Sequence, residues 1–128
     1  MRYGHDYSPG GSELLNYLIR QASIPEYQVR WRWTNDLCMC SSLLATGGDL
    51  VFGGEPSGEF NAWDANSGEL LWGFQCGSGH HSNPSTYSVD GRQYVVAPSG
   101  WGGWAEGFLP KMLGSSHGSA LFAFALPD

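Results

Sequence analysis

The stretch that decides the fold is Ala62-Trp63-Asp64-Ala65-Asn66-Ser67-Gly68-Glu69-Leu70-Leu71-Trp72. It is typical of the end of one β-strand, a tight turn and the start of a second strand. Asp64 is placed to accept hydrogen bonds from the backbone amides of the turn. Gly68 can adopt the positive φ that a tight hairpin turn needs. Leu70 and Trp72 are two residues apart in the second strand, so we expect them on one face. The stretch therefore predicts a β-hairpin.

The composition of the chain favours an all-β protein. A length of 128 residues is enough for one ordinary domain with a buried core. Charged residues make up only 14%, while there are 19 glycines and six each of Trp, Tyr and Phe. This combination indicates short, aromatic-rich strands joined by tight turns. The net charge of −6 and the lack of a basic cluster beyond Arg30 and Arg32 argue against a nucleic-acid partner.

Cysteine content and hydrophobic runs bear on the compartment. The three cysteines, Cys38, Cys40 and Cys76, are an odd number, which argues against a complete disulfide framework. The sequence has no apolar run long enough to cross a membrane, so we expect no membrane span. Residues 1–11 have no basic region followed by an apolar core, and no signal peptide is predicted there. Taken alone, these features indicate a cytoplasmic protein.

Turn signals divide the chain into two segments. Within residues 1–28 we predict a loop and a short helix that Ser12 caps and Pro25 ends. Residues 29–33 alternate Trp and Val with Arg, which predicts a half-buried strand. Asp90-Gly91 is a strong two-residue hairpin signal. The further strands predicted are 42–46, 49–53, 59–63 and 69–75, which form a four-stranded meander, and 84–89, 92–97 and 119–126, which form a three-stranded unit.

Strand parity places the long connections at one end of the sheets. The tight turns at Gly47-Gly48, Asn66-Ser67-Gly68 and Asp90-Gly91 fall at the opposite end. Function is usually carried by long loops on a rigid scaffold. We name the end formed by connections 34–41, 54–58, 76–83 and 98–118 the long-connection face. The residues with functional chemistry that we expect on or near it are Cys38, Cys40, Cys76, His80, His81, Trp101, Trp104 and His117.

Several motifs together resemble one known family. Ala62, Asp64, Gly68 and Trp72 match the tryptophan-docking motif, Ala-x-Asp-x-x-x-Gly-x-x-x-Trp, of β-propellers that bind pyrroloquinoline quinone (PQQ). Together with four further segments, this motif makes residues from about 29 to 128 resemble the C-terminal end of a PQQ-dependent alcohol dehydrogenase of the methanol/ethanol dehydrogenase type. The resemblance implies about two propeller blades, with Trp72 buried between them, after a non-family segment at 1–28. The further matching segments, in order, are Leu44–Phe52, Gly77–Gly79, Pro84–Tyr94 and Ser99–Gly103.

The resemblance also implies a function. Members of this family are periplasmic enzymes that oxidise primary alcohols with PQQ and a Ca²⁺ or lanthanide ion and pass electrons to a cytochrome. Cys40 stands where the family often has a Trp that reaches the quinone. The resemblance also implies that Trp104, which aligns with a family Trp at the substrate entrance, and Trp101 in the same loop lie at that entrance.

The family's catalytic and metal-binding residues lie upstream of this stretch, so we expect none in this chain. We therefore expect a fragment without a complete active site, which binds no cofactor tightly by itself. We also expect it to associate with the rest of a propeller or with itself.

Two alternatives remain open at this point. A tetrahedral Zn²⁺ site could be assembled from Cys38, Cys40, Cys76, His80 and His81, although Cys-x-Cys is not the usual knuckle spacing. A propeller piece could also be a non-catalytic scaffold or binding module with PQQ-like repeats. Metal-binding carboxylates elsewhere in the protein would favour the enzyme over the scaffold.

Overall fold

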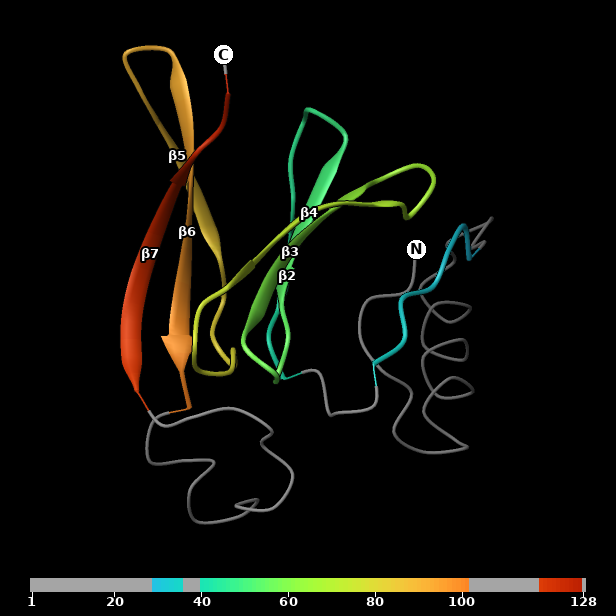
Figure 1. Ribbon diagram of the computed structural model, residues 1–128. Helices are drawn as coiled ribbons and strands as arrows, with labels where there is room; N and C mark the ends of the chain where they lie inside the picture. Colours follow the sequence, from blue (N-terminus) through green and yellow to red (C-terminus); the bar gives the residue numbers. More distant parts are fainter. Residues whose placement is uncertain (1–28, 36–39, 102–117, 128) are drawn as a thin grey trace, which may run out of the picture.

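The computed structural model describes residues 29–35, 40–101 and 118–127. These residues form seven β-strands and no helix, so the predicted all-β class is confirmed, and none of them could cross a membrane as a helix (Figure 1). The helix predicted within residues 1–28 lies outside the described residues. The strands are β1 (Leu43–Ala45), β2 (Leu50–Gly54), β3 (Glu59–Asp64), β4 (Leu70–Gln75), β5 (Ser85–Val89), β6 (Arg92–Gly100) and β7 (Ser119–Ala125).

The predicted strand bounds agree with the observed ones to within a few residues, and the largest difference is in β6. We predicted that this strand ends before Pro98, yet it continues to Gly100. β5 pairs with β6 only as far as Ser85↔Val96, whereas β7 pairs with it to the end. Proline has no N–H for a ladder, and here it lies where β6 has a partner on one side only.

The strands form two antiparallel sheets that pack face to face. The first sheet has the order β1-β2-β3-β4 and the second the order β5-β6-β7, so each is a meander in chain order (Figure 1). Apolar side chains from both sheets meet between them, and the ring of Phe60 stacks on that of Phe124 with centroids 5.8 Å apart. The fully buried cluster is Phe52, Phe60, Ala62, Val95 and Ala97.

The docking turn forms as the sequence predicts. The Asp64 carboxylate accepts hydrogen bonds from the amides of Asn66 (2.9 Å) and Ser67 (2.7 Å) and from the Ser67 hydroxyl (2.9 Å). These bonds, those from Ser67 above all, hold the pKa of Asp64 below its ordinary value. Gly68 has a φ of 76°, the left-handed conformation expected of it. The turn is therefore closed by its own residues.

The prediction of a strand at 29–33 is wrong, because residues 29–35 form no strand. They are attached to the first sheet through side chains instead. The Trp31 indole donates to the Ala65 carbonyl at 2.9 Å and lies so close to Gly68 that a Cβ there would be 2.6 Å from the ring. The Trp33 ring lies 5.4 Å from that of Trp63. The alternation of Trp and Arg in this segment is therefore explained by two indoles that pack on the first sheet and its docking turn, and not by a hydrogen-bonded β-strand.

The prediction that Trp72 is buried between the blades is also wrong, since its side chain is 40% exposed. The ring does point toward the second sheet, where it meets Phe124 edge-on at 5.0 Å. Among the described residues the second sheet has no strand beyond β7, so part of the ring stays uncovered. The pairing of β3 with β4 changes register between Ala62 and Trp63: Ala62 pairs with Trp72, but the next residue, Trp63, pairs with Leu70. Leu70 and Trp72 are therefore paired with neighbouring residues of β3, and the simple alternation that would put them on one face is broken.

We predict that the two tryptophans of the motif region differ in their effect on stability. Trp63 is 2% exposed and Trp72 is 40% exposed. Trp63→Ala should lower the free energy of unfolding by about 3–5 kcal/mol, and Trp72→Ala by about 1–2 kcal/mol, because less apolar area is lost. Urea unfolding of both variants measures this. Equal losses for the two variants would contradict the packing described for β4.

Candidate functional site at the long-connection face

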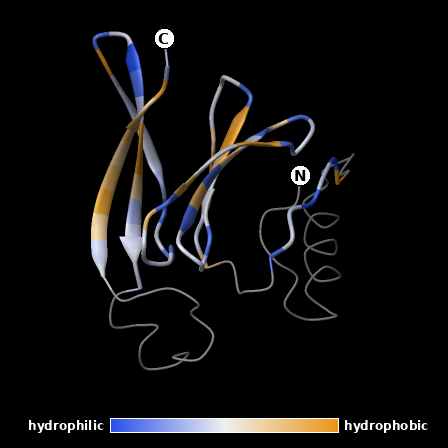
Figure 2. Cartoon of the chain, viewed as in Figure 1, coloured by the Kyte–Doolittle hydropathy of each residue, from blue (hydrophilic) through white to orange (hydrophobic). Residues whose placement is uncertain are grey.

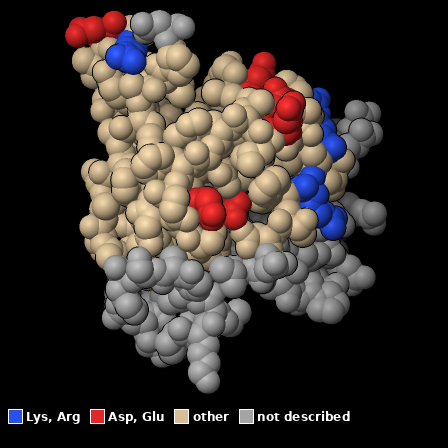
Figure 3. All heavy atoms as spheres, viewed as in Figure 1, with Lys and Arg blue, Asp and Glu red and all other residues tan. Residues whose placement is uncertain are grey.

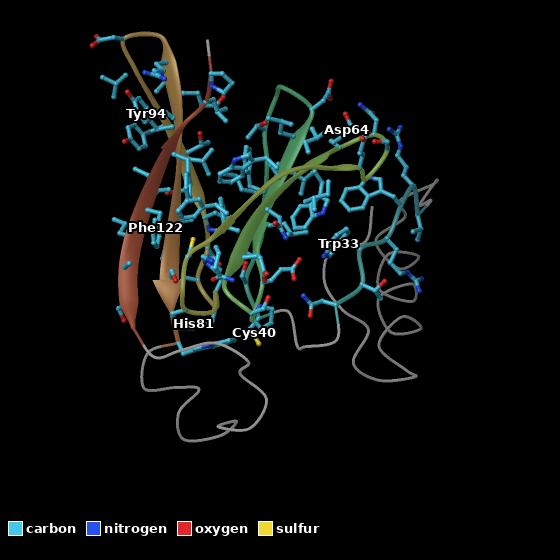
Figure 4. All side chains as sticks on the ribbon, viewed as in Figure 1. Trp33, Cys40, Asp64, His81, Tyr94 and Phe122 are labelled. Atoms are coloured by element: carbon cyan, nitrogen blue, oxygen red, sulfur yellow. The ribbon has the colours of Figure 1, made fainter. Side chains whose placement is uncertain are left out.

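The connection 76–83 joins the two sheets and is hydrogen-bonded to both. The His80 amide donates to the Glu55 carbonyl at 3.2 Å, in the β2–β3 connection. The Gly100 amide donates to the Gly79 carbonyl at 2.8 Å, and the Ser99 hydroxyl donates to the Ser78 carbonyl at 2.7 Å. Figure 4 shows His81 and Cys40 at this end and Asp64 near the other. The predicted grouping at the long-connection face is confirmed for its described members.

Two adjacent histidines contact the end of β6. His80 is 2% exposed, and its Nδ1 lies 2.8 Å from the Pro98 carbonyl oxygen. Because a carbonyl only accepts, this nitrogen carries the proton, while Nε2 is buried with no hydrogen-bond partner in the described structure. Burial lowers the pKa of His80, against the opposing effect of the carbonyls of Pro98 and Gly58. His80 is therefore held as a neutral imidazole within the inter-sheet connection.

His81 links the same connection to an aromatic side chain. Its Nδ1 lies 2.6 Å from the Gly100 carbonyl oxygen, and its ring stacks on Trp101 at 6.2 Å and 20°. Trp101 is itself 3% exposed, and a Cβ on Gly79 would lie 2.2 Å from its ring. Gly79 thus has no side chain because the indole occupies that space. These residues form a packed wall at the long-connection face.

A buried carboxylate in the connection 54–58, which is not among the predicted site residues, lies beside this wall. Glu55 is 6% exposed. Its carboxylate accepts hydrogen bonds from the Trp33 indole and the Asn61 amide, both at 2.8 Å, and from the Asn35 amide. The sequence signal for this network is Asn61 in the middle of the apolar strand β3. A buried side-chain amide needs hydrogen-bond partners, and Glu55 is one of them. Glu55 ties residues 33–35 to the first sheet.

The other predicted site residues are placed as follows. Cys40 and Cys76 are half-buried, and burial raises the pKa of Cys76 to about 11, so its thiol stays protonated at neutral pH. Trp101 lies in the wall just described, and its role at the substrate entrance stays a prediction. Cys38, Trp104 and His117 lie outside the described residues.

The Zn²⁺ alternative finds no support within the described part of the chain. No three His, Cys, Asp or Glu side chains come together there in a way that could hold a metal ion. Each of the two histidines has its Nδ1 on a backbone carbonyl.

Comparison with known proteins assigns the family. Residues 20–95 match a PQQ family, described as the β-propeller domain of glucose, ethanol and alcohol dehydrogenases. The chain belongs to this PQQ propeller family. The predicted resemblance is thereby confirmed. The boundary that we placed between residues 28 and 29 stays a prediction, and the family match begins earlier, at residue 20.

Two of the named relatives are quinoprotein alcohol dehydrogenases, and a third is a lupanine hydroxylase. The chain is 39% identical over 101 residues to the quinoprotein alcohol dehydrogenase PedH of Pseudomonas putida, with 76% of this chain and 17% of that protein covered. It is 38% identical over 105 residues to the quinoprotein ethanol dehydrogenase of Pseudomonas aeruginosa, with coverages of 79% and 17%. It is 43% identical over 102 residues to lupanine 17-hydroxylase [cytochrome c] of a Pseudomonas species, with coverages of 76% and 14%.

Solved structures agree with this assignment. A europium-containing methanol dehydrogenase superposes with a TM-score of 0.65 at 32% identity and covers 75% of this chain and 21% of its own. Quinohemoprotein alcohol dehydrogenase from Comamonas testosteroni gives 0.58 at 37% identity, with coverages of 66% and 12%. The chain thus spans less than a quarter of the length of each of these relatives and structures.

We predict that His80 makes the stability of the fold depend on pH. Its pKa is lowered in the folded protein from an ordinary value of 6.5, so the unfolded chain binds more protons below that pH. The stability contribution is therefore present above pH 6.5 and is lost as the pH falls toward the folded-state pKa. Urea unfolding between pH 7.5 and 5 should show it, and His80→Asn should flatten the curve. An unchanged pH slope in that variant would contradict the assignment.

We also predict that the Glu55 network holds Trp33 in place. Glu55→Gln replaces an acceptor-only carboxylate by an amide whose NH₂ faces donors, so the free energy of unfolding should fall by about 2–4 kcal/mol. The Trp33 indole should become more solvated, which shifts tryptophan emission to the red. The control is Glu59→Gln, at the start of β3, whose carboxylate accepts a hydrogen bond from the Ser57 hydroxyl and from no indole or amide side chain of the described residues. An equal effect in both variants would contradict the network.

Proposed function

We propose that this chain is a two-blade part of a quinoprotein that oxidises primary alcohols with PQQ and passes the electrons to a cytochrome. The observation that carries the proposal is the identity of 38–39% with a quinoprotein alcohol dehydrogenase and a quinoprotein ethanol dehydrogenase over 76–79% of the chain. The cytochrome in the name of one relative and the methanol dehydrogenase among the structures support the acceptor and the substrate class. A periplasmic location belongs to the same proposal.

The described residues are suited to form one side of a cofactor site and not a complete site. They include no group of three potential metal ligands, and their only Arg and Lys side chains are Arg30, Arg32 and Arg92. Arg30 hydrogen-bonds Asn66 in the docking turn, and Arg92 follows the Asp90-Gly91 turn, so both lie away from the long-connection face. A Ca²⁺ or lanthanide ion and a carboxylate-bearing quinone need such partners. In this proposal they come from other parts of the protein.

The contribution of this chain is then rigidity at the long-connection face. Cys40, Trp101 and Trp104 are the positions that we propose face the cofactor or the substrate entrance. His80, His81 and Glu55 hold the connections around them through bonds to backbone carbonyls and to Trp33. Groups that orient a substrate act only if their supporting residues keep them in place to a fraction of an ångström. This is the reason for so many buried polar contacts at one end of a small fold.

We expect the isolated chain to be inactive. PQQ accepts the electrons of an alcohol only where it is held against a metal ion and a base, and the part of the chain that the structure describes holds no group of three potential metal ligands. Purified protein mixed with PQQ and Ca²⁺ or a lanthanide should give no ethanol- or methanol-dependent reduction of an artificial electron acceptor. Saturable turnover that disappears when the metal is removed would contradict the proposal that the chain is only part of the site.

A chimera tests the proposed function directly. We expect residues 40–127, placed in the matching region of the Pseudomonas aeruginosa quinoprotein ethanol dehydrogenase, to give an enzyme that reduces the acceptor dye with ethanol and PQQ. The matched control is the same chimera with Glu55→Gln, which should lose activity through disorder of the wall. A folded chimera that binds no PQQ would favour the alternative, a non-catalytic propeller scaffold.

A further inference from the structure

Part of the connection between β4 and β5 lies against the end of β6 without belonging to either sheet. β5 stops pairing with β6 at Val96, and beyond that point residues 78–81 lie beside β6 instead. One backbone–backbone hydrogen bond is described between the two, from the Gly100 amide to the Gly79 carbonyl. The other bonds between them are made by side chains, those of Ser99, His80 and His81. We name residues 78–81 the bridging segment.

The bridging segment is bounded by exposed residues. Gly77 precedes it with a φ of 87°, and a Cβ at that position would meet no atom within 4 Å. Asn83, near its other end, is also exposed. Loop residues with free space around them can absorb a change of backbone direction. The segment can therefore leave β6 while the pairs of β6 with β5 and β7 stay formed.

Two buried polar atoms of the bridging segment lack a hydrogen bond. Ser78 is 4% exposed and His80 is 2% exposed. The Ser78 Oγ and the His80 Nε2 have no hydrogen-bond partner among the described residues. A polar atom buried in this way costs free energy, which contact with water removes. The segment is therefore held in place less firmly than its number of hydrogen bonds indicates.

The ring of His80 is enclosed by apolar groups and backbone. β2 contacts it at Gly54, where a Cβ would lie 2.2 Å from the ring. β3 contacts it through the Phe60 ring, with centroids 5.6 Å apart, and β6 through the Pro98 carbonyl at 2.8 Å. A proton added to this ring would place a positive charge in surroundings that do not solvate it.

Nearby titratable side chains do not supply a counter-ion. On the elements that pack against His80, those at this end of the sheets are Glu55, Glu59, Cys76 and His81. Both carboxylates accept hydrogen bonds from other side chains, and burial keeps the Cys76 thiol neutral by raising its pKa to about 11. His81 stacks on Trp101. The pKa of His80 is lowered by burial and is opposed only by two backbone carbonyls. The blue Lys and Arg side chains on the face drawn in Figure 3 lie toward its upper and right-hand margins.

We propose that the bridging segment is a pH-sensitive latch: when His80 takes up a proton, residues 78–81 detach from β6 and from the β2–β3 connection as one unit, while both sheets stay folded. Detachment brings the charged ring into water, which solvates it. The sheets stay together because their buried cluster contains no residue of the segment. Figure 2 shows the hydrophobic stretches of β2 and β7 that remain. The inference rests on the packing of the segment and does not depend on alcohol oxidation.

Hydrogen exchange of the full chain, followed by NMR between pH 7.5 and 5, tests the latch. The reporters are the amides of His80 and Gly100, which donate to the carbonyls of Glu55 and Gly79. After correction for the intrinsic effect of pH on exchange, their protection should fall together below pH 6.5, by up to about tenfold per pH unit, because each opening takes up one proton. Amides in the β2–β3 ladder should keep theirs. Constant protection of the reporters, or an equal fall in that ladder, would overturn the proposal.

Two matched variants assign the proton to one ring. His80→Asn keeps a side-chain N–H that can donate to the Pro98 carbonyl but takes up no proton, so the pH dependence of both reporters should disappear. His81→Asn makes the same change at the neighbouring position and should keep the pH dependence. The opposite pattern would overturn the assignment.

A measurement on the unaltered protein does not depend on the folding of either variant. The NMR titration of the His80 ring should have the same midpoint as the loss of protection at the two reporter amides. A ring that is protonated while both amides stay protected would show that the charge is tolerated in place, and the latch would be wrong.

Discussion

The stacking of Phe60 on Phe124 is the contact on which the two-sheet structure depends. A meander of three or four strands has one apolar face, and it is stable only when that face is covered. Here each sheet covers the other, and the two rings at 5.8 Å lie among Phe52, Val95 and Ala97. The small residues Ala62 and Ala97 leave room for these rings. Loss of this contact would expose both apolar faces at once.

The same contact determines what the long-connection face can do. Once the sheets are stacked, the chain must pass from β4 to β5 across their end, and its backbone polar groups need partners there. The structure provides them through Glu55, Pro98 and Gly100, and it brings His80 so near Gly54 that a Cβ would be 2.2 Å from the ring. A connection held at both sheets by such contacts is a rigid wall, which suits a surface that must face a bound molecule at a constant distance.

Local hydrogen bonding is what the sequence predicts well. Asp64, Ser67 and Gly68 close the docking turn within a few residues, so the pattern of residue types is sufficient to identify it. The strand bounds follow for the same reason, since turn residues mark them. The wall could be predicted only in outline: strand parity brought His80 and His81 to the right end, but not to their carbonyl partners on β6.

The errors come from contacts between residues far apart in the chain. Burial of Trp72 depends on how far the second sheet extends, which no local pattern near the residue records. Likewise, Trp31 and Trp33 have the alternation of a strand, but they are placed by Ala65 and Glu55. Glu55 was missed because its three donors come from two separate segments. The docking motif therefore identifies a propeller blade, whereas the surroundings of its tryptophan depend on which strands lie beside that blade. Among the described residues the turn of the motif is complete while Trp72 stays 40% exposed, so the turn depends on local residues and the cover over the tryptophan on distant ones.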